Sequence, residues 1–148
     1  MQTAASVARY ILRFFQQAED PISNLKLQKL IYYCQGWHLA IRSAPLFADR
    51  LEAWVHGPVQ PSVYGAYKHY RWSPITEDVA EVVLAPEERS VVDDVLAVYG
   101  GDSGYALELR THNEEPWIEA RGEIPADQES RAEISQPAMA RFFKTLMQ

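Results

Sequence analysis

The sequence predicts a mainly α-helical fold, a compact single-domain bundle of about six helices with a small β-hairpin, over residues 1–148. A length of 148 residues is typical of one domain with one core. Hydrophobic residues make up 47% of the chain and aromatic residues 11%, which is enough to fill such a core. Several segments repeat apolar side chains at helical spacing, and one short segment combines apolar pairs with turn residues.

An amphipathic helix is expected over residues 4–18, because apolar side chains recur there at the spacing of one helix face. The helix should end at Asp20-Pro21, since the residue before a proline is pushed out of helical geometry. Its expected buried face consists of Val7, Tyr10, Ile11, Phe14, Phe15 and Ala18.

A second helix is expected to begin after Ser23, whose hydroxyl suits an N-cap. This helix is too apolar for an edge element, so we place it at the centre of the core. Gly36 weakens a helix by roughly 1 kcal/mol relative to Ala, and its presence therefore favours close packing against a neighbour. Lys26 and Lys29 mostly fall off the apolar stripe and are expected to be exposed. The stripe itself consists of Leu27, Leu30, Ile31, Cys34, His38 and Ile41.

A short hairpin is expected next, with Leu46-Phe47, a turn at residues 48–50 and a strand over residues 51–55. The stretch AWVHGPVQP, residues 53–61, is interpreted as a rigid corner between this hairpin and a following helix. A glycine in the corner allows a backbone angle closed to other residues, and the proline after it fixes the next angle. The following helix begins at Pro61, a favourable first position, and ends near Trp72.

Residues 75–85 fit either a strand or a loop with apolar side chains inserted into the core, and the sequence leaves both open. A clear helix then begins at Pro86, followed by two glutamates that suit the positive end of the helix dipole. Gly100-Gly101 ends it. Its expected core face consists of Val91, Val92, Val95, Leu96 and Tyr99.

Shorter elements are expected in the last third of the chain. Asp102 or Ser103 caps a short helix, and THNEEPW, residues 111–117, predicts a turn into one more helical turn. Residues 122–133 are polar and acidic and are expected to form a loop. Ser135 then caps the last helix. The side chains expected to face inward from these helices are Leu107, Leu109, Met139, Phe142, Phe143 and Leu146.

The net charge is −6, and it is unevenly spread. Residues 1–74 carry eight Lys or Arg and four Asp or Glu, whereas residues 75–148 carry six and sixteen. A net acidic chain disfavours nucleic-acid binding. The sequence has no apolar run long enough for a membrane span and no signal peptide, and its single Cys excludes an internal disulfide. These features predict a cytoplasmic protein that does not enter membranes.

Four residues offer a less favoured alternative, a metal-dependent or Cys-His enzyme. Cys34 and His38 lie one helical turn apart, and His56 and His112 could join them as ligands. A catalytic thiol must be exposed and activated, whereas Cys34 falls on the apolar stripe. The sequence carries no Gly-rich phosphate loop, HExxH or GxSxG motif. The residues therefore favour a protein without catalytic residues, metal or cofactor.

Four motifs in order resemble the Panacea domain, also called the SocA-like antitoxin domain. They are LKLQKLIYYCQGWHLA at residues 25–40, PLFADRLEAWVHGPVQPSVY at 45–64, ELRTHNEEPWIEAR at 108–121 and ISQPAMARFF at 134–143. The resemblance covers most of the chain. The positions assigned to family motifs as structural residues are Leu27, Lys29, Leu30, Trp54, Gly57, Pro58, Val59, Thr111, His112, Pro116 and Trp117.

The resemblance implies a small helical antitoxin of bacterial or phage origin that binds and neutralises a toxin encoded nearby. An alternative within the family is a proteolytic adaptor that delivers the toxin to a protease. Some family members carry an extra DNA-binding domain, but the motifs fill this chain, so autonomous nucleic-acid binding is not expected. The identity of the toxin and the oligomeric state stay open.

An aromatic-rich surface near the corner is the expected partner-binding site, because Tyr and Trp bury much area with few rotors. The same residues are equally normal in a core, and the sequence does not decide between the two. His112 is expected to hydrogen-bond across to the corner and connect the two motifs. The residues assigned to partner binding are Lys26, Lys29, Trp54, His56, Tyr64, Tyr67, Tyr70 and Trp72, with the two lysines as a charged rim.

Overall fold

The computed structural model describes residues 1–147 and shows a mainly α-helical fold with a small antiparallel sheet, as the sequence predicts. The described residues form seven α-helices and one short 3-10 helix, rather than about six helices. The elements are α1 (Ala4–Gln17), α2 (Asn24–Arg42), β1 (Leu51–Trp54), β2 (Gly57–Val59), α3 (Pro61–Tyr67), η1 (Lys68–Tyr70), α4 (Pro86–Tyr99), α5 (Gly104–Thr111), α6 (Glu115–Arg121), β3 (Glu133–Ile134) and α7 (Gln136–Thr145).

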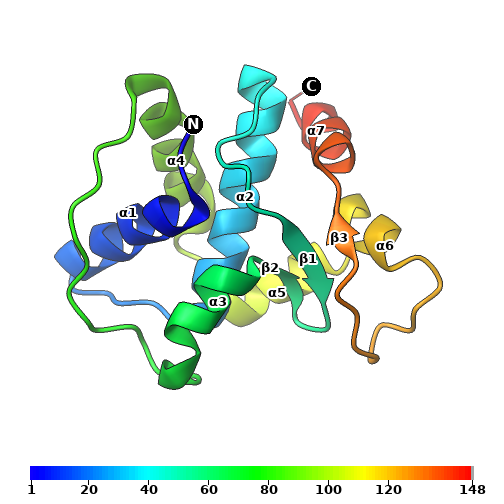
Figure 1. Ribbon diagram of the computed structural model, residues 1–148, viewed down its shortest axis with the longest axis horizontal. Helices are drawn as coiled ribbons and strands as arrows, with labels where there is room; N and C mark the ends of the chain where they lie inside the picture. Colours follow the sequence, from blue (N-terminus) through cyan, green and yellow to red (C-terminus); the bar gives the residue numbers. More distant parts are fainter. Residues whose placement is uncertain (148) are drawn as a thin grey trace.

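Helix α2 forms the centre of the molecule, as expected (Figure 1). Helices α1 and α4 lie on one side of it, and the sheet, α6 and α7 lie on the other (Figure 1). The Ser23 hydroxyl accepts a hydrogen bond from the Lys26 amide and caps the helix, as predicted. Gly36 faces Phe143 so closely that an added Cβ would lie 2.1 Å from the ring. The prediction that Ile41 belongs to the buried stripe is wrong, because α2 ends beside solvent at that point.

Helix α1 begins at a capping box formed by Thr3 and Ser6, and its buried face matches most of the expected one. Phe14 and Ala18 are the exceptions, because Phe14 lies at the edge of the apolar stripe and Ala18 lies beyond the last helical residue, and both are exposed. The Phe14 ring still makes an edge contact with Phe15, which is buried.

The hairpin lies later in the chain than the sequence predicts. Leu46 and Phe47 do not form a strand with β1; Phe47 instead makes an isolated parallel bridge with Gln2. The turn therefore lies at Val55-His56, where Trp54 pairs with Gly57, and not at residues 48–50. The corner sequence is itself the hairpin, rather than a loop that follows one.

A third strand joins the sheet in the order β2-β1-β3. Residues 122–132 form the expected polar connection, but Glu133 and Ile134 pair with Glu52 and Leu51. This pairing brings the chain back beside the hairpin before α7 begins (Figure 1). Ser135 caps α7 as predicted.

Residues 71–85 contain no helix or strand, so the loop interpretation of residues 75–85 is confirmed. Ile75 and Leu84 are buried in the core, and Val79 and Val82 pack partly against it. The loop is therefore held to the core through separate apolar contacts along its length. Leu109 and Leu146, which were expected to face inward, are exposed because they fall on the solvent side of α5 and beyond the end of α7.

A buried carboxylate connects α2 to the start of α6. The hydroxyls of Tyr32 and Tyr33 donate to the two carboxylate oxygens of Glu114, at 3.0 and 3.1 Å. Burial raises the pKa of Glu114 to about 7, although both tyrosine hydrogen bonds oppose the rise. Burial also raises the pKa of both tyrosines, so the hydroxyls remain protonated donors.

Candidate partner-binding cleft

The corner depends on a glycine that no other residue could replace without a clash. Gly57 has a φ of +105°, which L-residues rarely adopt. A Cβ at this position would lie 2.7 Å from Cε of Lys29 and 2.8 Å from Oγ1 of Thr111. The expectation that Gly57 allows a backbone angle closed to other residues is therefore confirmed, and Gly57, Lys29 and Thr111 meet at one point.

Lys29 lies beneath the corner rather than on the surface. Its ammonium donates to the carbonyl oxygen of Pro58 at 3.0 Å, and the residue is 0% exposed. Burial lowers the pKa of Lys29 to about 7, although the charge of Glu108 opposes the shift. The prediction that Lys29 is an exposed rim residue is wrong, because β2 covers the side of α2 from which it projects.

Two aromatic rings from the THNEEPW segment hold the hairpin turn from outside. His112 Nε2 donates to the carbonyl oxygen of Val55 at 2.8 Å, and Trp117 Nε1 donates to that of Trp54 at 2.8 Å. The two rings stack on each other with centroids 4.3 Å apart. The expected hydrogen bond from His112 to the corner is confirmed. Burial lowers the pKa of His112, which keeps the ring neutral.

Arg121 fixes the loop that faces the corner. Its guanidinium donates to the carbonyl oxygen of Ala53 at 2.9 Å and to that of Pro125 at 2.7 Å, and also to that of Gln128. One side chain therefore joins β1 to two points in residues 122–132. The guanidinium also lies over the ring of Trp117, 4.8 Å from its centroid.

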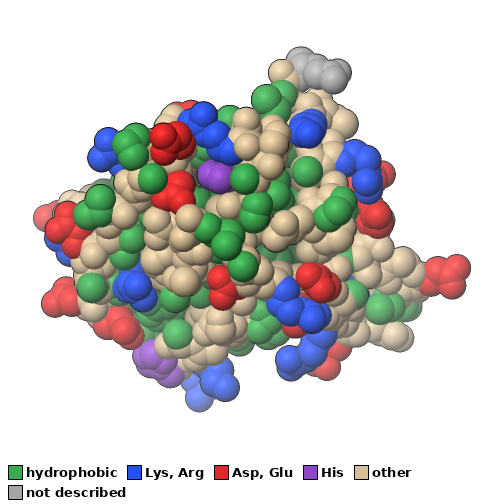
Figure 2. All heavy atoms as spheres, turned by 45° about the horizontal axis from the view of Figure 1, so that its top comes forward, with side chains coloured by type: hydrophobic (Ala, Val, Ile, Leu, Met, Phe, Trp, Pro, Cys, Tyr) green, Lys and Arg blue, Asp and Glu red, His purple; other side chains and the backbone are tan. Residues whose placement is uncertain are grey.

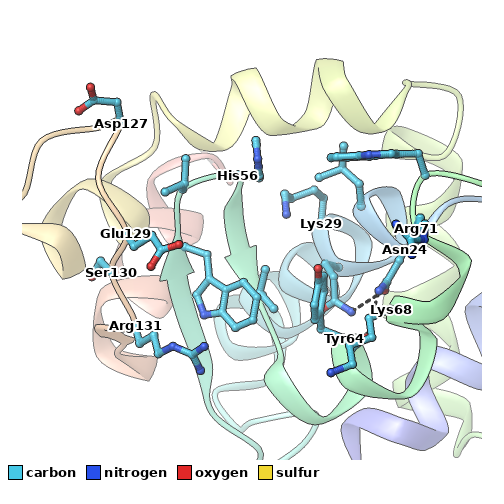
Figure 3. A pocket seen from close by; sticks show the side chains of 16 residues that line it. Asn24, Lys29, His56, Tyr64, Lys68, Arg71, Asp127, Glu129, Ser130 and Arg131 are labelled. Atoms are coloured by element: carbon cyan, nitrogen blue, oxygen red, sulfur yellow. Dashed lines mark hydrogen bonds between the residues drawn. The ribbon is translucent and has the colours of Figure 1, made fainter.

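The corner, the loop and the α3–η1 segment enclose a cleft of about 620 Å³ (Figure 3). The view shows Asp127, Glu129 and Arg131 on one side and Lys68 and Arg71 on the other, with Lys29 between them (Figure 3). The cleft is lined by Asn24, Leu25, Gln28, Lys29, Trp54, Val55, His56, Val59, Tyr64, Lys68, Arg71, Trp72, Asp127, Glu129, Ser130 and Arg131.

Aromatic contacts shape the interior of the cleft. Trp54 meets Tyr64 edge to face, with ring centroids 5.0 Å apart, and Arg131 lies over Trp54 at 5.2 Å. His56 approaches Trp72 at 6.2 Å, and its Nδ1 lies 3.0 Å from a carboxylate oxygen of Glu108. Trp72 is 73% exposed, which is unusual for so large an apolar ring.

The structure brings some of the residues assigned to partner binding together and separates others. Trp54, His56, Tyr64 and Trp72 line the cleft together with Lys29, whose side chain is fully buried.

Three others lie outside the cleft lining. Lys26 donates to the carbonyl oxygen of Gly100 at 2.6 Å, Tyr67 is buried in the core, and the Tyr70 hydroxyl accepts from the Glu77 amide at 3.0 Å.

Sequence reasoning missed five charged residues of the cleft, because they lie in loops or at helix ends without a motif. One signal is visible only in the structure: Arg71 has a φ of +56°, a conformation that costs a residue with a side chain about 1–3 kcal/mol. The missed residues are Lys68, Arg71, Asp127, Glu129 and Arg131.

The histidines and the cysteine of the alternative site have separate partners. Cys34 is buried in the core, where burial raises the pKa of its thiol. His38 Nδ1 lies 2.6 Å from the carbonyl oxygen of Ala44, and His56 and His112 face Glu108 and Val55. Within residues 1–147, no three His, Cys, Asp or Glu side chains form a group that could hold a metal ion.

Charged side chains of both signs are interspersed over the face shown in Figure 2. None of the helices in residues 1–147 combines the length and the apolar character needed to cross a membrane.

Comparison with known proteins places the chain in a family of antitoxin-like proteins. The family described as "Antitoxin SocA-like, Panacea domain" matches residues 27–118. This range includes the corner, the hairpin, the whole THNEEPW segment and the first part of α6, whereas the last motif, residues 134–143, lies outside it.

Antitoxin SocA of Caulobacter vibrioides (strain NA1000 / CB15N) is 32% identical over 127 residues, which cover 77% of this chain and 68% of that protein. The chain belongs to the SocA-like Panacea antitoxin family. No solved structure matches it significantly. Family membership supports an antitoxin role with a toxin as the general class of partner, and favours a non-enzymatic protein.

Proposed function

We propose that this protein neutralises a cognate toxin by binding it directly, through the surface around the cleft. The observation that supports the proposal is the position of Trp72, a largely exposed ring that flanks the family's corner motif. Trp is enriched at binding hot spots because it buries a large area with few rotors. The ring stands beside His56 on the rim of the cleft.

The corner is suited to binding because it is held rigidly from several sides. His112, Trp117 and Arg121 each donate to a carbonyl of residues 53–55, and Lys29 supports Pro58 from below. A preorganised surface loses little conformational entropy when a partner docks. The mechanism that follows is occlusion, in which the toxin's working face is covered.

The test is a growth-rescue assay in bacteria that express the product of the neighbouring gene, with and without this protein. We expect the double variant His56→Ala/Trp72→Ala to lose rescue while its thermal unfolding midpoint stays within a few degrees of the wild type. Tyr105→Ala is the control, since Tyr105 is a largely exposed aromatic residue that does not line the cleft. Full rescue by the double variant would overturn the role of this surface.

A measurement of toxin lifetime separates occlusion from delivery to a protease. Under occlusion, the toxin persists in a complex that co-purifies with this protein, and a pulse-chase shows an unchanged or longer toxin half-life. A half-life shortened by the protein, and restored when the protease is deleted, would instead establish the proteolytic adaptor.

A further inference from the structure

We infer that the cleft recognises an acidic, extended segment of its protein partner, with an apolar side chain of that segment seated between Trp54 and Trp72. The inference deepens the proposed function and rests on it for the identity of the partner as the toxin. A cleft of about 620 Å³ is large enough to enclose two or three side chains.

The charge of the cleft is opposite to that of the chain. The whole protein has a net charge of −6, yet the cleft lining holds three exposed cations, Lys68, Arg71 and Arg131, against two Asp or Glu, with the buried Lys29 beneath them. Within the described residues 1–147, the side chains of Lys68, Arg71 and Arg131 form no ion pair with an acidic group. These three cations are exposed, so they are available to carboxylates of a ligand.

The two walls differ in charge, which gives the bound segment a preferred placement. The wall formed by α3 and η1 presents Lys68 and Arg71, whereas the opposite loop presents Asp127 and Glu129 beside Arg131 (Figure 3). Carboxylates of the ligand are therefore drawn toward the α3–η1 wall. Polar amide groups of the segment face the acidic loop.

The aromatic residues supply an apolar seat between these walls. Trp54 Nε1 already donates to Glu52 at 2.8 Å, so the indole needs no further polar partner. An apolar side chain of the ligand would contact the part of the ring that Arg131 and Tyr64 leave uncovered. Trp72 directly follows Arg71, which is held at a φ of +56°. Strained residues of this kind cluster at binding sites, where the surrounding structure holds them in place.

The same features disfavour a nucleotide as the ligand. A phosphate chain requires convergent backbone N–H groups or a single basic pole. Here the cations stand on two walls, and one of the walls also carries two carboxylates. The glycine of the corner, Gly57, belongs to the sheet, where it pairs with Trp54, and so it is not part of a glycine-rich phosphate loop.

Selection from a displayed library of random peptides on the purified full chain tests the inference. Peptides of about twelve residues extend roughly 40 Å and can cross the cleft. We expect the selected sequences to be enriched in Asp and Glu around an aromatic or large aliphatic residue. Their affinity, measured by fluorescence anisotropy with a labelled selected peptide, should fall as the salt concentration rises.

A pair of charge-reversed variants locates the binding. Lys68→Glu/Arg71→Glu should weaken the peptide by at least about tenfold. The control Arg89→Glu/Lys144→Glu makes the same change in net charge at exposed positions outside the cleft, and should change affinity by less than about twofold. Failure to select peptides, selection without acidic enrichment, equal effects of both variants, or displacement of the peptide by ATP would each overturn the inference.

The growth-rescue assay with the same variants separates this inference from the proposed function. If no acidic peptide binds but rescue still depends on Trp72, the inference fails and the proposed function stands. If acidic peptides bind the cleft but Lys68→Glu/Arg71→Glu and His56→Ala/Trp72→Ala both rescue fully, acidic recognition stands and neutralisation through the cleft fails.

Discussion

His112 Nε2 lies 2.8 Å from the carbonyl oxygen of Val55, so a side chain at the end of α5 holds the turn of the hairpin. A carbonyl oxygen can only accept a hydrogen bond, which means that this ring nitrogen carries the proton. The neighbouring carbonyl, that of Trp54, accepts from Trp117 in the same way. The shape of the corner is thus imposed by two stacked rings from a distant segment.

Replacement of His112 with Ala should therefore destabilise the whole fold. The variant leaves the Val55 carbonyl without its donor and removes a half-buried ring from its stack on Trp117. We expect the free energy of unfolding in urea to fall by about 1–2 kcal/mol. His69→Ala is the control, because His69 is exposed and its loss should change stability by less than about 0.5 kcal/mol. Equal losses in both variants would contradict the role given to His112.

Addition of a methyl group at Gly36 should force α2 and α7 apart. A Cβ there would lie 2.1 Å from Phe143, and overpacking of this kind costs about 1–3 kcal/mol. Gly65→Ala, in helix α3, is the matched control, since no atom lies within 4 Å of a Cβ added there. This variant should stabilise the protein by about 0.5 kcal/mol or more, because Ala favours a helix over Gly. Thermal unfolding of both variants measures the difference; a Gly36→Ala protein as stable as the wild type would refute the close packing.

Stability should depend on pH through Glu114. Its folded-state pKa, about 7, exceeds its ordinary value of 4.5, so the folded protein binds more protons than the unfolded chain between these values. The contribution of Glu114 to stability is therefore fully present below pH 4.5 and is lost as the pH rises through 7. Its upper limit is about 3 kcal/mol, at roughly 1.4 kcal/mol per pKa unit.

The Glu114→Gln variant tests this dependence. It retains a hydrogen-bonding group of the same shape and removes the titration, so its urea midpoint should fall less than that of the wild type between pH 5 and pH 8. Glu115→Gln, at an exposed neighbouring position, should keep the dependence of the wild type. Parallel curves for Glu114→Gln and wild type would show that Glu114 does not titrate in this range.

Relief of the backbone strain at Arg71 should stabilise the protein and weaken ligand binding. Glycine adopts a positive φ without steric cost, so Arg71→Gly should raise the free energy of unfolding by about 1 kcal/mol. Arg71→Ala removes the same charge but keeps the strain, and should give no such gain. Both variants should bind the acidic peptide more weakly. A stability gain in Arg71→Ala equal to that in Arg71→Gly would show that the side chain, and not the backbone, is responsible.

Local signals account for the parts of the fold that could be predicted from the sequence. The hydroxyls of Ser23 and Ser135 cap helices through contacts with residues three positions away, and such contacts depend little on the rest of the chain. Gly36 and Gly57 were informative because a glycine inside a helix or a tight turn typically marks close packing or a positive φ, and the structure shows one of each.

Long-range contacts account for the errors. Phe47 is an apolar residue next to turn residues, as in a hairpin, but its bridge is to Gln2, which no local pattern indicates. Lys29 lies off the apolar stripe of α2, and it is buried only because β2 packs over that side. The loop that carries Asp127 and Glu129 is positioned by Arg121. Its hydrogen bonds go to backbone carbonyls, which every residue has, so no sequence pattern predicts them.

The position of α2 also has a consequence for the order in which the chain folds during synthesis. Its central side chains pack against α7, and the surface at Gly36 is covered by Phe143, near the end of the described chain. While the ribosome is still adding α7, that apolar surface has nothing to cover it. We expect the nascent chain to present it to chaperones and to complete its core only after α7 has been released from the exit tunnel.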